Sequence, residues 1–157
     1  MDVHSKEIRR KNMQAIQGKN TSPELAVRRM LFSQGFRYRL HVSKLPGTPD
    51  ILLPKYRTVV LIQGCFWHSH GCHLCKIPKT RTEFWQDKIE KNRQRDIKNY
   101  TALENLGWRV IVIWECALKG KFRWEADNLC TYLKNIIQAP EQFPNSQEIT
   151  YQKISED

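Results

Sequence analysis

Twelve consecutive residues, 64–75, contain an unusual number of side chains that bind metal ions. They hold three of the five cysteines of the chain and three of its five histidines. Thiolate and imidazole groups at this spacing are the usual ligands of Zn²⁺. The segment therefore predicts a metal site, and a purely structural zinc site would account for the cysteines. It would not account for His68 or for the adjacent Phe66 and Trp67, which need a separate explanation.

Three acidic residues stand at positions where a carboxylate could serve chemistry. Asp50 follows Pro49 at the start of a short apolar run, so it lies at the mouth of a predicted strand. Glu24 falls in the first turn of a predicted helix, and Asp96 is an acid within a basic stretch. Each also has an ordinary explanation, as a turn residue, a helix-capping residue and a surface ion-pair partner respectively. The residues alone leave both readings open.

Alternating helices and strands are predicted to position these residues. A helix is expected to begin with a capping box of Thr21 and Glu24, or with Ser22 as the cap and Pro23 at the first helical position, and to end at Gly35. Hydrophobic periodicity then predicts strands at 36–41, 50–53, 58–63 and 108–114, and helices at about 82–106 and 122–138. The strand at 58–63, the long helix and the strand at 108–114 form a βαβ unit with a right-handed crossover. The last twenty residues, rich in Gln, Pro, Asn and Ser, predict a loose tail.

The composition favours one basic domain that binds a polyanion. The chain has 157 residues and a formal net charge of +10. In a small protein such a charge points to nucleic acid, with simple solubility as the alternative. Residues 1–20 are interpreted as a basic arm that orders on DNA, or else as a disordered tail. No apolar run reaches membrane-spanning length, no signal peptide is evident, and clustered cysteines in odd number favour a reducing cytoplasm.

The order of elements and several motifs point to one family of nucleases. Helix, strand, strand with Pro49-Asp50, strand, helix, strand is the order of restriction-endonuclease-like enzymes, so the expected fold class is α/β with a mixed central sheet flanked by helices. The chain closely resembles the very short patch repair (Vsr) DNA mismatch endonucleases at 11–16, 45–50, 64–68, 80–85, 107–110 and 114–116. We expect an endonuclease domain at 21–138, between the arm and a C-terminal tail at 139–157.

The resemblance implies a Mg²⁺-dependent endonuclease that nicks one strand of duplex DNA next to a T:G mismatch. Asp50 and the backbone carbonyl of Ile62 would hold the Mg²⁺, and Glu24 would hold a water beside it. His68 would carry a proton between water and phosphate oxygens, and Asp96 would orient its ring.

The chain departs from the family pattern at Gln63, where a second histidine is frequent. Glutamine can hydrogen-bond a phosphate or a water but cannot carry a proton, which leaves His68 as the proton carrier. Two other functions stay open. One is a nuclease of the same fold directed at another mismatch or site, and the other is a zinc-stabilised DNA-binding module without catalysis.

The resemblance also implies a structural zinc and a set of DNA contacts. The zinc ligands would be Cys65, His70, Cys72 and Cys116, with His73 and Cys75 as nearby competitors. An aromatic wedge would enter the duplex beside the mismatch, formed by Phe66, Trp67 and Trp85. The arm would contribute Lys6, Arg9, Arg10, Lys11, Asn12 and Met13. We expect a monomer in the bacterial cytoplasm whose partners are mismatched double-stranded DNA and a repair protein of the MutL type.

Overall fold

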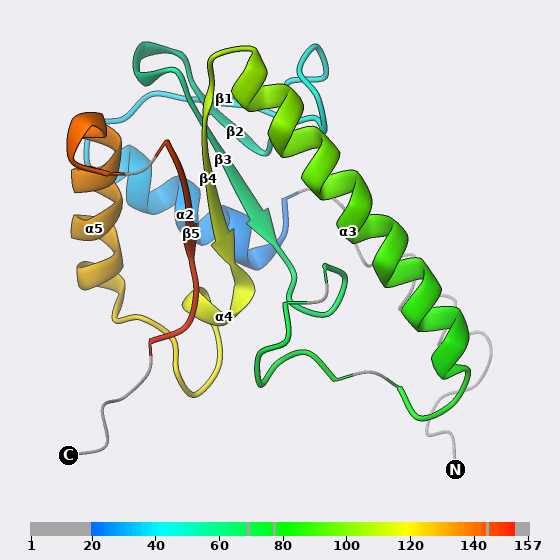
Figure 1. Ribbon diagram of the computed structural model, residues 1–157. Coiled ribbons are helices and arrows are strands. Elements are labelled where there is room, and N and C mark those ends of the chain that lie inside the picture. Colours follow the sequence, from blue (N-terminus) through cyan, green and yellow to red (C-terminus); the bar gives the residue numbers. More distant parts are fainter. Residues whose placement is uncertain (1–19, 69, 77, 144, 153–157) are drawn as a thin grey trace.

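A five-stranded mixed β-sheet forms the centre of the molecule (Figure 1). The computed structural model describes residues 20–68, 70–76, 78–143 and 145–152. The strands follow chain order across the sheet: β1 (Arg39–Leu40), β2 (Ile51–Leu53), β3 (Thr58–Gln63), β4 (Arg109–Trp114) and β5 (Ser146–Ile149). The first three strands pair antiparallel and the last three pair parallel, so β3 belongs to both halves.

Helices cover both faces of this sheet. The long α3 (Thr82–Asn105) lies on one face and connects β3 to β4, while α2 (Ser22–Ser33) and α5 (Ala126–Gln138) lie on the other face (Figure 1). Shorter turns complete the chain: η1 (Pro54–Tyr56), α4 (Glu115–Leu118) and η2 (Pro140–Gln142). The predicted α/β class, a mixed sheet with flanking helices, is confirmed, as is the βαβ unit of β3, α3 and β4.

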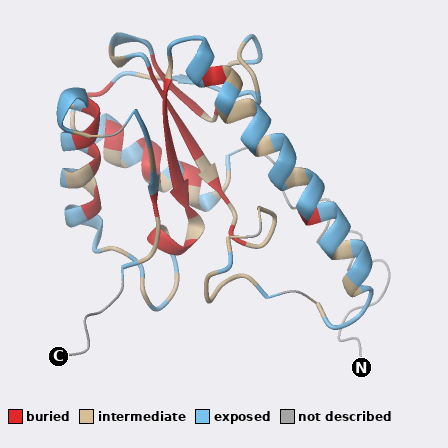
Figure 2. Ribbon diagram, viewed as in Figure 1, coloured by how far each residue is buried: buried red, intermediate tan, exposed pale blue. Residues whose placement is uncertain are grey.

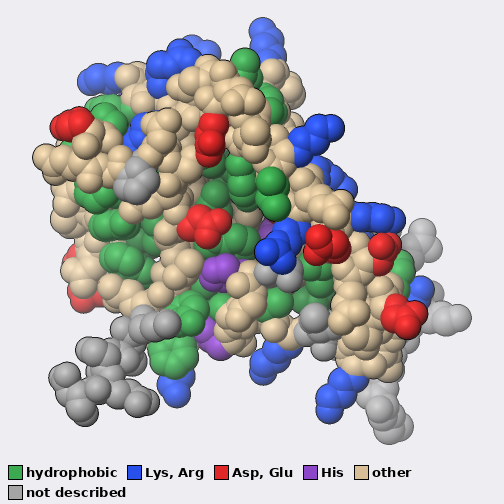
Figure 3. All heavy atoms as spheres, in the orientation of Figure 1, with side chains coloured by type: hydrophobic (Ala, Val, Ile, Leu, Met, Phe, Trp, Pro, Cys, Tyr) green, Lys and Arg blue, Asp and Glu red, His purple; other side chains and the backbone are tan. Residues whose placement is uncertain are grey.

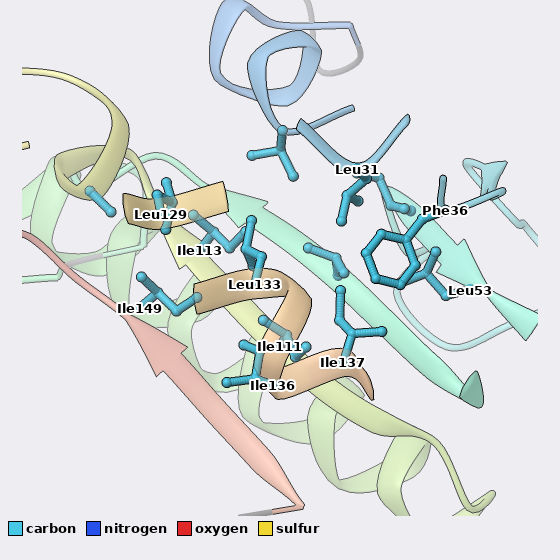
Figure 4. Close-up of a cluster of buried hydrophobic side chains, with 14 residues drawn as sticks. Leu31, Phe36, Leu53, Ile111, Ile113, Leu129, Leu133, Ile136, Ile137 and Ile149 are labelled. Atoms are coloured by element: carbon cyan, nitrogen blue, oxygen red, sulfur yellow. The ribbon is translucent and has the colours of Figure 1, made fainter. Parts of the chain in front are cut away.

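The alternation of side chains along β3 and β4 divides the hydrophobic core in two. Val60 and Ile111 face α2 and α5, in a cluster that also contains Leu31, Ile113, Leu133, Ile136 and Ile137 (Figure 4). Val59 and Val112 face the other way, with Leu103 of α3. Because both strands are buried on both faces, their sequences are continuous apolar runs, and Figure 2 shows this buried centre in red. Each fully buried Ile or Leu contributes about 1.5–3 kcal/mol.

The helix α3 is only lightly covered by the rest of the described chain. Of its 24 residues, only Ile89 and Leu103 are buried. Phe84 is 47% exposed and Ile97 is 56% exposed. Figure 2 shows the pale blue surface of this helix, and Figure 1 shows its N-terminal half running past the sheet. The helix therefore presents both basic and apolar side chains to the outside.

The strand predicted at 36–41 is much shorter than expected. Only Arg39–Leu40 pairs with β2. Phe36 turns into the core, where it is 3% exposed, and His41 has a left-handed φ of 49°. The left-handed backbone at His41 ends the extended segment directly after Leu40.

Two predictions for the C-terminal part of the chain are also wrong. The helix predicted at 122–138 begins at Ala126, because Trp124 is held in a loop by the carbonyls of Ala117 and Thr150. The predicted loose tail contains β5, which pairs with β4 through residues 146–149.

Within the described ranges, no helix is both long enough and apolar enough to cross a membrane.

Candidate active site and metal-binding cluster

A cavity of about 200 Å³ opens between the sheet and α3. Asp50 reaches it from the start of β2, Gln63 from the end of β3, His68 from the following loop, and Asp96 and Tyr100 from α3. Three of the four predicted catalytic residues thus line one cavity, although they are far apart in sequence. On the face shown in Figure 3, histidine side chains reach the surface at the middle of the molecule.

Asp50 is held in place by the strand beside it. The backbone N–H of Ile62 donates a hydrogen bond to Oδ2 of Asp50 over 2.9 Å. Burial raises the pKa of Asp50 to about 7, and the neighbouring Glu24 adds to this effect. A partly buried carboxylate beside the buried carboxylate of Glu24 is unfavourable when both are charged. A hard divalent cation would remove that repulsion, so this pair fits such an ion.

Glu24 is fixed through one of its two oxygens. Its Oε2 accepts hydrogen bonds from the backbone N–H of Asn20 at 2.7 Å and from Nη2 of Arg28 at 2.6 Å. The same Nη2 of Arg28 lies 3.0 Å from Nε2 of His41. Nη2 of Arg28 also donates to Oδ1 of Asn20 at 2.7 Å, so both of its hydrogens have an oxygen acceptor. Glu24, His41 and Asp50 each offer a ligand atom within 4.8 Å of the others.

Sequence reasoning did not identify Arg28 and His41, which lie next to the Glu24 carboxylate. The spacing of four between Glu24 and Arg28 is the usual one for an ion pair on a helix and was available as a signal. His41 carried no comparable signal, because its approach to α2 depends on the bend after β1.

His68 and Asp96 form a hydrogen-bonded pair. Nδ1 of His68 bonds to Oδ2 of Asp96, and both side chains are partly buried. The backbone N–H of His68 bonds to the carbonyl of Gly64 at 3.3 Å, which turns the loop back toward β3. Since Nδ1 is used by Asp96, Nε2 is the ring nitrogen that remains for a ligand in the cavity. This arrangement of carboxylate and imidazole suits proton transfer.

The four predicted zinc ligands form one compact cluster. Ligand atoms of Cys65, His70, Cys72 and Cys116 all lie within 4.8 Å of one another. Nδ1 of His70 is 3.6 Å from Sγ of Cys65 and 3.4 Å from Sγ of Cys116. Bonds of about 2.0–2.3 Å to a tetrahedral zinc ion give ligand separations of this size.

The surroundings of this cluster also suit a metal. Burial raises the pKa of the Cys65 and Cys116 thiols, so their thiolates need a cation to form at neutral pH. Burial lowers the pKa of His70, which keeps its ring neutral, as a metal ligand must be. Cys75 and His73 are not members of the cluster, and the ring of His73 lies between Phe122 and Tyr151 instead.

The three predicted wedge residues lie together. Phe66 is 5.1 Å from Trp67 and 5.6 Å from Trp85 between ring centroids, and the two indoles are 6.0 Å apart. The ammonium group of Lys88 is 5.4 Å from the Trp67 ring and 5.8 Å from the Trp85 ring. All three aromatic side chains are half-buried, so part of each ring is available to a partner. The predicted arm residues lie outside the described ranges: Lys6, Arg9, Arg10, Lys11, Asn12 and Met13.

Comparison with known proteins decides the family. The pattern of the family described as DNA mismatch endonuclease Vsr matches residues 1–74. The chain is 48% identical to the DNA mismatch endonuclease Vsr of Escherichia coli (strain K12), over 87% of each chain. It is 53% identical to a type II nicking enzyme of Xanthomonas oryzae pv. oryzae, over 87% of this chain and 96% of the relative. This protein belongs to the Vsr family. It is also 56% identical to a type II nicking enzyme of Neisseria meningitidis, over 69% of this chain and 78% of that enzyme.

The Vsr family is thus one of DNA-cleaving nucleases, and in this member Gln63 and Tyr100 line the cavity. Gln63 is 6% exposed and takes the place where the resemblance leads one to expect a histidine. Tyr100, one helical turn after Asp96, lies in the same cavity. Sequence reasoning noted Gln63 only as a departure and did not consider Tyr100, although its spacing of four from Asp96 put both on one face of α3.

Proposed function

We propose that this protein is a Mg²⁺-dependent endonuclease that nicks one strand of duplex DNA next to a T:G mismatch by hydrolysing a phosphodiester bond. One observation carries the proposal: the partly buried Asp50 and the hydrogen-bonded pair of His68 and Asp96 share a single cavity. A DNA-binding module without catalysis has no need of this combination. The relative from Escherichia coli is named a DNA mismatch endonuclease, which supports a mismatched duplex as the substrate.

Each residue of the cavity has a task in this proposal. Asp50 and the carbonyl of Ile62 would hold the Mg²⁺, which supplies charge neutralisation at the phosphate when it is bound. Nε2 of His68 would move a proton between water and phosphate oxygens. Asp96 would keep the ring oriented and support its charged form. Glu24, fixed by Arg28 through one oxygen, has its other oxygen available to hold a water.

We propose that the cluster of three cysteines and one histidine binds a structural zinc. Four protein ligands complete a tetrahedron, so no position remains for a substrate. Cys65, His70 and Cys72 belong to the loop after β3, and Cys116 follows β4. The ion would therefore tie the loop that carries His68 to the end of β4.

We further propose how the remaining parts contact DNA. The predicted wedge residues Phe66, Trp67 and Trp85 would stack on bases beside the mismatch. The net charge of +10 would attract the backbone phosphates. Residues 1–20 would form the arm, 21–138 the endonuclease domain with a restriction-endonuclease-like core, and 139–157 a C-terminal segment. The protein would act as a monomer, with a repair partner of the MutL type.

Single-turnover nicking at saturating enzyme tests the reaction. Duplexes with a T:G pair, with other mismatches and with none should be compared in Mg²⁺ and in EDTA. Asp50→Ala should abolish nicking, and His68→Ala should slow it roughly 10²–10⁴-fold. Asp87→Ala is the matched control, because Asp87 is an exposed carboxylate on α3 that pairs with Lys91. Wild-type rates in both active-site variants would overturn the proposal, and equal rates on another mismatch would overturn the T:G assignment.

A further inference from the structure

The hydroxyl of Tyr100 and the side-chain amide of Gln63 are buried polar groups that line the cavity. Among the described residues, neither Oη of Tyr100 nor Oε1 of Gln63 has a hydrogen-bond partner, although both atoms are buried. Buried polar atoms of folded proteins are nearly always paired, so an unpaired one at a functional site asks for a ligand. Here two such atoms line the cavity that contains Asp50 and His68.

The elements on either side of the cavity hold this pair rigidly. Gln63 is the last residue of β3 and lies opposite Trp114 in the parallel ladder. Tyr100 comes from the C-terminal part of α3, four residues after Asp96, so both side chains leave the same face of the helix. The side chain of Gln63 lies against the Tyr100 hydroxyl. Gln63 and Tyr100 therefore both belong to regular secondary structure, β3 and α3, and not to a loop.

Apart from His68, the cavity offers an anion only uncharged donors. Among the described residues that line it there is no lysine or arginine, while Thr48, Gln63, Asn99 and Tyr100 carry hydroxyl or amide groups. A phosphate in this cavity would thus need hydrogen bonds from uncharged side chains in addition to the contact with His68. Burial raises the pKa of Tyr100, so its hydroxyl keeps its proton at neutral pH and remains a donor. An amide N–H of Gln63 can donate to Oη, which directs the hydroxyl proton toward the ligand.

We propose that Tyr100 and Gln63 form a binding site for the phosphodiester that is cut, in which the Tyr100 hydroxyl donates a hydrogen bond to one non-bridging phosphate oxygen and Gln63 orients that hydroxyl. The inference rests on the proposed function and adds a substrate contact to it. It gives Gln63 a role that does not require proton transfer. Tyr100 contacts the reacting group, and Gln63 is a positioning residue that acts through it.

The test replaces one hydroxyl group and one phosphate oxygen. Tyr100→Phe keeps the ring and should slow single-turnover nicking of the T:G duplex roughly 10–100-fold, as expected for a lost hydrogen bond to a charged group. The same rates are then measured on duplexes with sulfur at the scissile phosphate, using each of the two phosphorothioate diastereomers separately. For one diastereomer the difference between wild type and Tyr100→Phe should largely disappear, because sulfur accepts hydrogen bonds poorly. For the other it should persist.

Two further variants separate this role from a structural one. Gln63→Met should slow nicking less than Tyr100→Phe, and the double variant should be no slower than Tyr100→Phe alone, because the two residues act as one unit. Tyr56→Phe, a tyrosine on the opposite side of the sheet that packs against Phe36, should leave the rate unchanged.

The outcomes distinguish the inference from the function on which it rests. Normal nicking by Tyr100→Phe, or the same loss on oxygen and both sulfur substrates, overturns the inference while the effect of Asp50→Ala keeps the proposed function. Absence of Mg²⁺-dependent nicking in the wild-type protein overturns both.

Discussion

The imidazole of His70 lies flat against the indole of Trp114. Their ring centroids are 4.2 Å apart and their planes are 7° from parallel. Trp114 ends β4 and is 6% exposed, and Cys116 follows two residues later. One short segment thus supplies both a ligand atom of the cluster and the surface that orients a second ligand. Residues that orient metal ligands influence affinity almost as strongly as the ligands themselves.

Replacing this indole should weaken zinc binding without removing a ligand. Trp114→Leu is expected to release zinc roughly 10–100-fold faster to a chromogenic chelator, because the His70 ring loses its support. Trp108→Leu is the control, since Trp108 precedes the other end of β4, where the guanidinium of Arg57 covers its ring. Equal release rates from Trp114→Leu and wild type would show that the stacking does not orient His70.

The ligand assignment itself can be tested with two cysteines. Cys116→Ser should lower the zinc content well below one ion per chain and reduce the yield of folded protein, because metal binding contributes to folding. Cys75→Ser should keep a full equivalent of zinc, because Cys75 lies outside the cluster. Elemental analysis of protein purified without added metal measures both. A zinc loss in Cys75→Ser equal to that in Cys116→Ser would contradict the assignment.

The central elements could be predicted from sequence because their signals are local. β3 and β4 are continuous apolar runs, and α3 has a clear stop at Gly107, which has a φ of +88°. The edge strand β5 gave no such signal. Only Ile149 of the four residues of β5 is buried. The segment forms a strand because β4 offers an open edge for pairing. For β1 the prediction was too long. The alternating pattern covers residues 36–41, but only Arg39–Leu40 pairs with β2, because an alternating sequence does not by itself make a strand.

Only those site residues that lie within recognisable sequence motifs could be predicted. Asp50, His68 and Asp96 stand in segments that resemble a known family, and the structure brings them into one cavity. The contacts of Arg28 with His41, and of Tyr100 with Gln63, join elements that are distant in sequence. Such contacts depend on how α2 and α3 pack on the sheet, which no local pattern specifies.

The raised pKa of Asp50 should make the proposed binding of Mg²⁺ depend on pH. In the metal-free protein this pKa is raised to about 7 by burial, so below pH 7 the ion must displace a proton. The apparent Mg²⁺ affinity should therefore rise about tenfold per pH unit up to pH 7 and level off above it. Calorimetric titration at several pH values measures this, with Asp50→Asn as a control that should not bind. An affinity that does not change between pH 5.5 and pH 7 would contradict the prediction.

The buried ion pair of α2 should be costly to break on one side. Arg28→Met leaves the Glu24 carboxylate, which is 2% exposed, without its guanidinium partner. The expected loss of unfolding free energy is about 3 kcal/mol in urea denaturation. The double variant Arg28→Met with Glu24→Gln should recover part of this loss, because it removes the unpaired charge. A double variant less stable than Arg28→Met would show that the pair does not act in this way.

The hydrogen bond between Asp96 and His68 should matter through both its geometry and its charge, and two substitutions separate these. Asp96→Asn can still accept a hydrogen bond from Nδ1 of His68, but it no longer supports the charged ring. Asp96→Ala removes both effects. We expect losses in single-turnover nicking that increase from Asp96→Asn through Asp96→Ala to His68→Ala, the last at roughly 10²–10⁴-fold. Asp87→Asn, on the exposed part of α3, should leave the rate unchanged. Zinc content should stay at the wild-type value throughout, because neither residue belongs to the cluster. A wild-type rate in Asp96→Ala would show that His68 works without this partner.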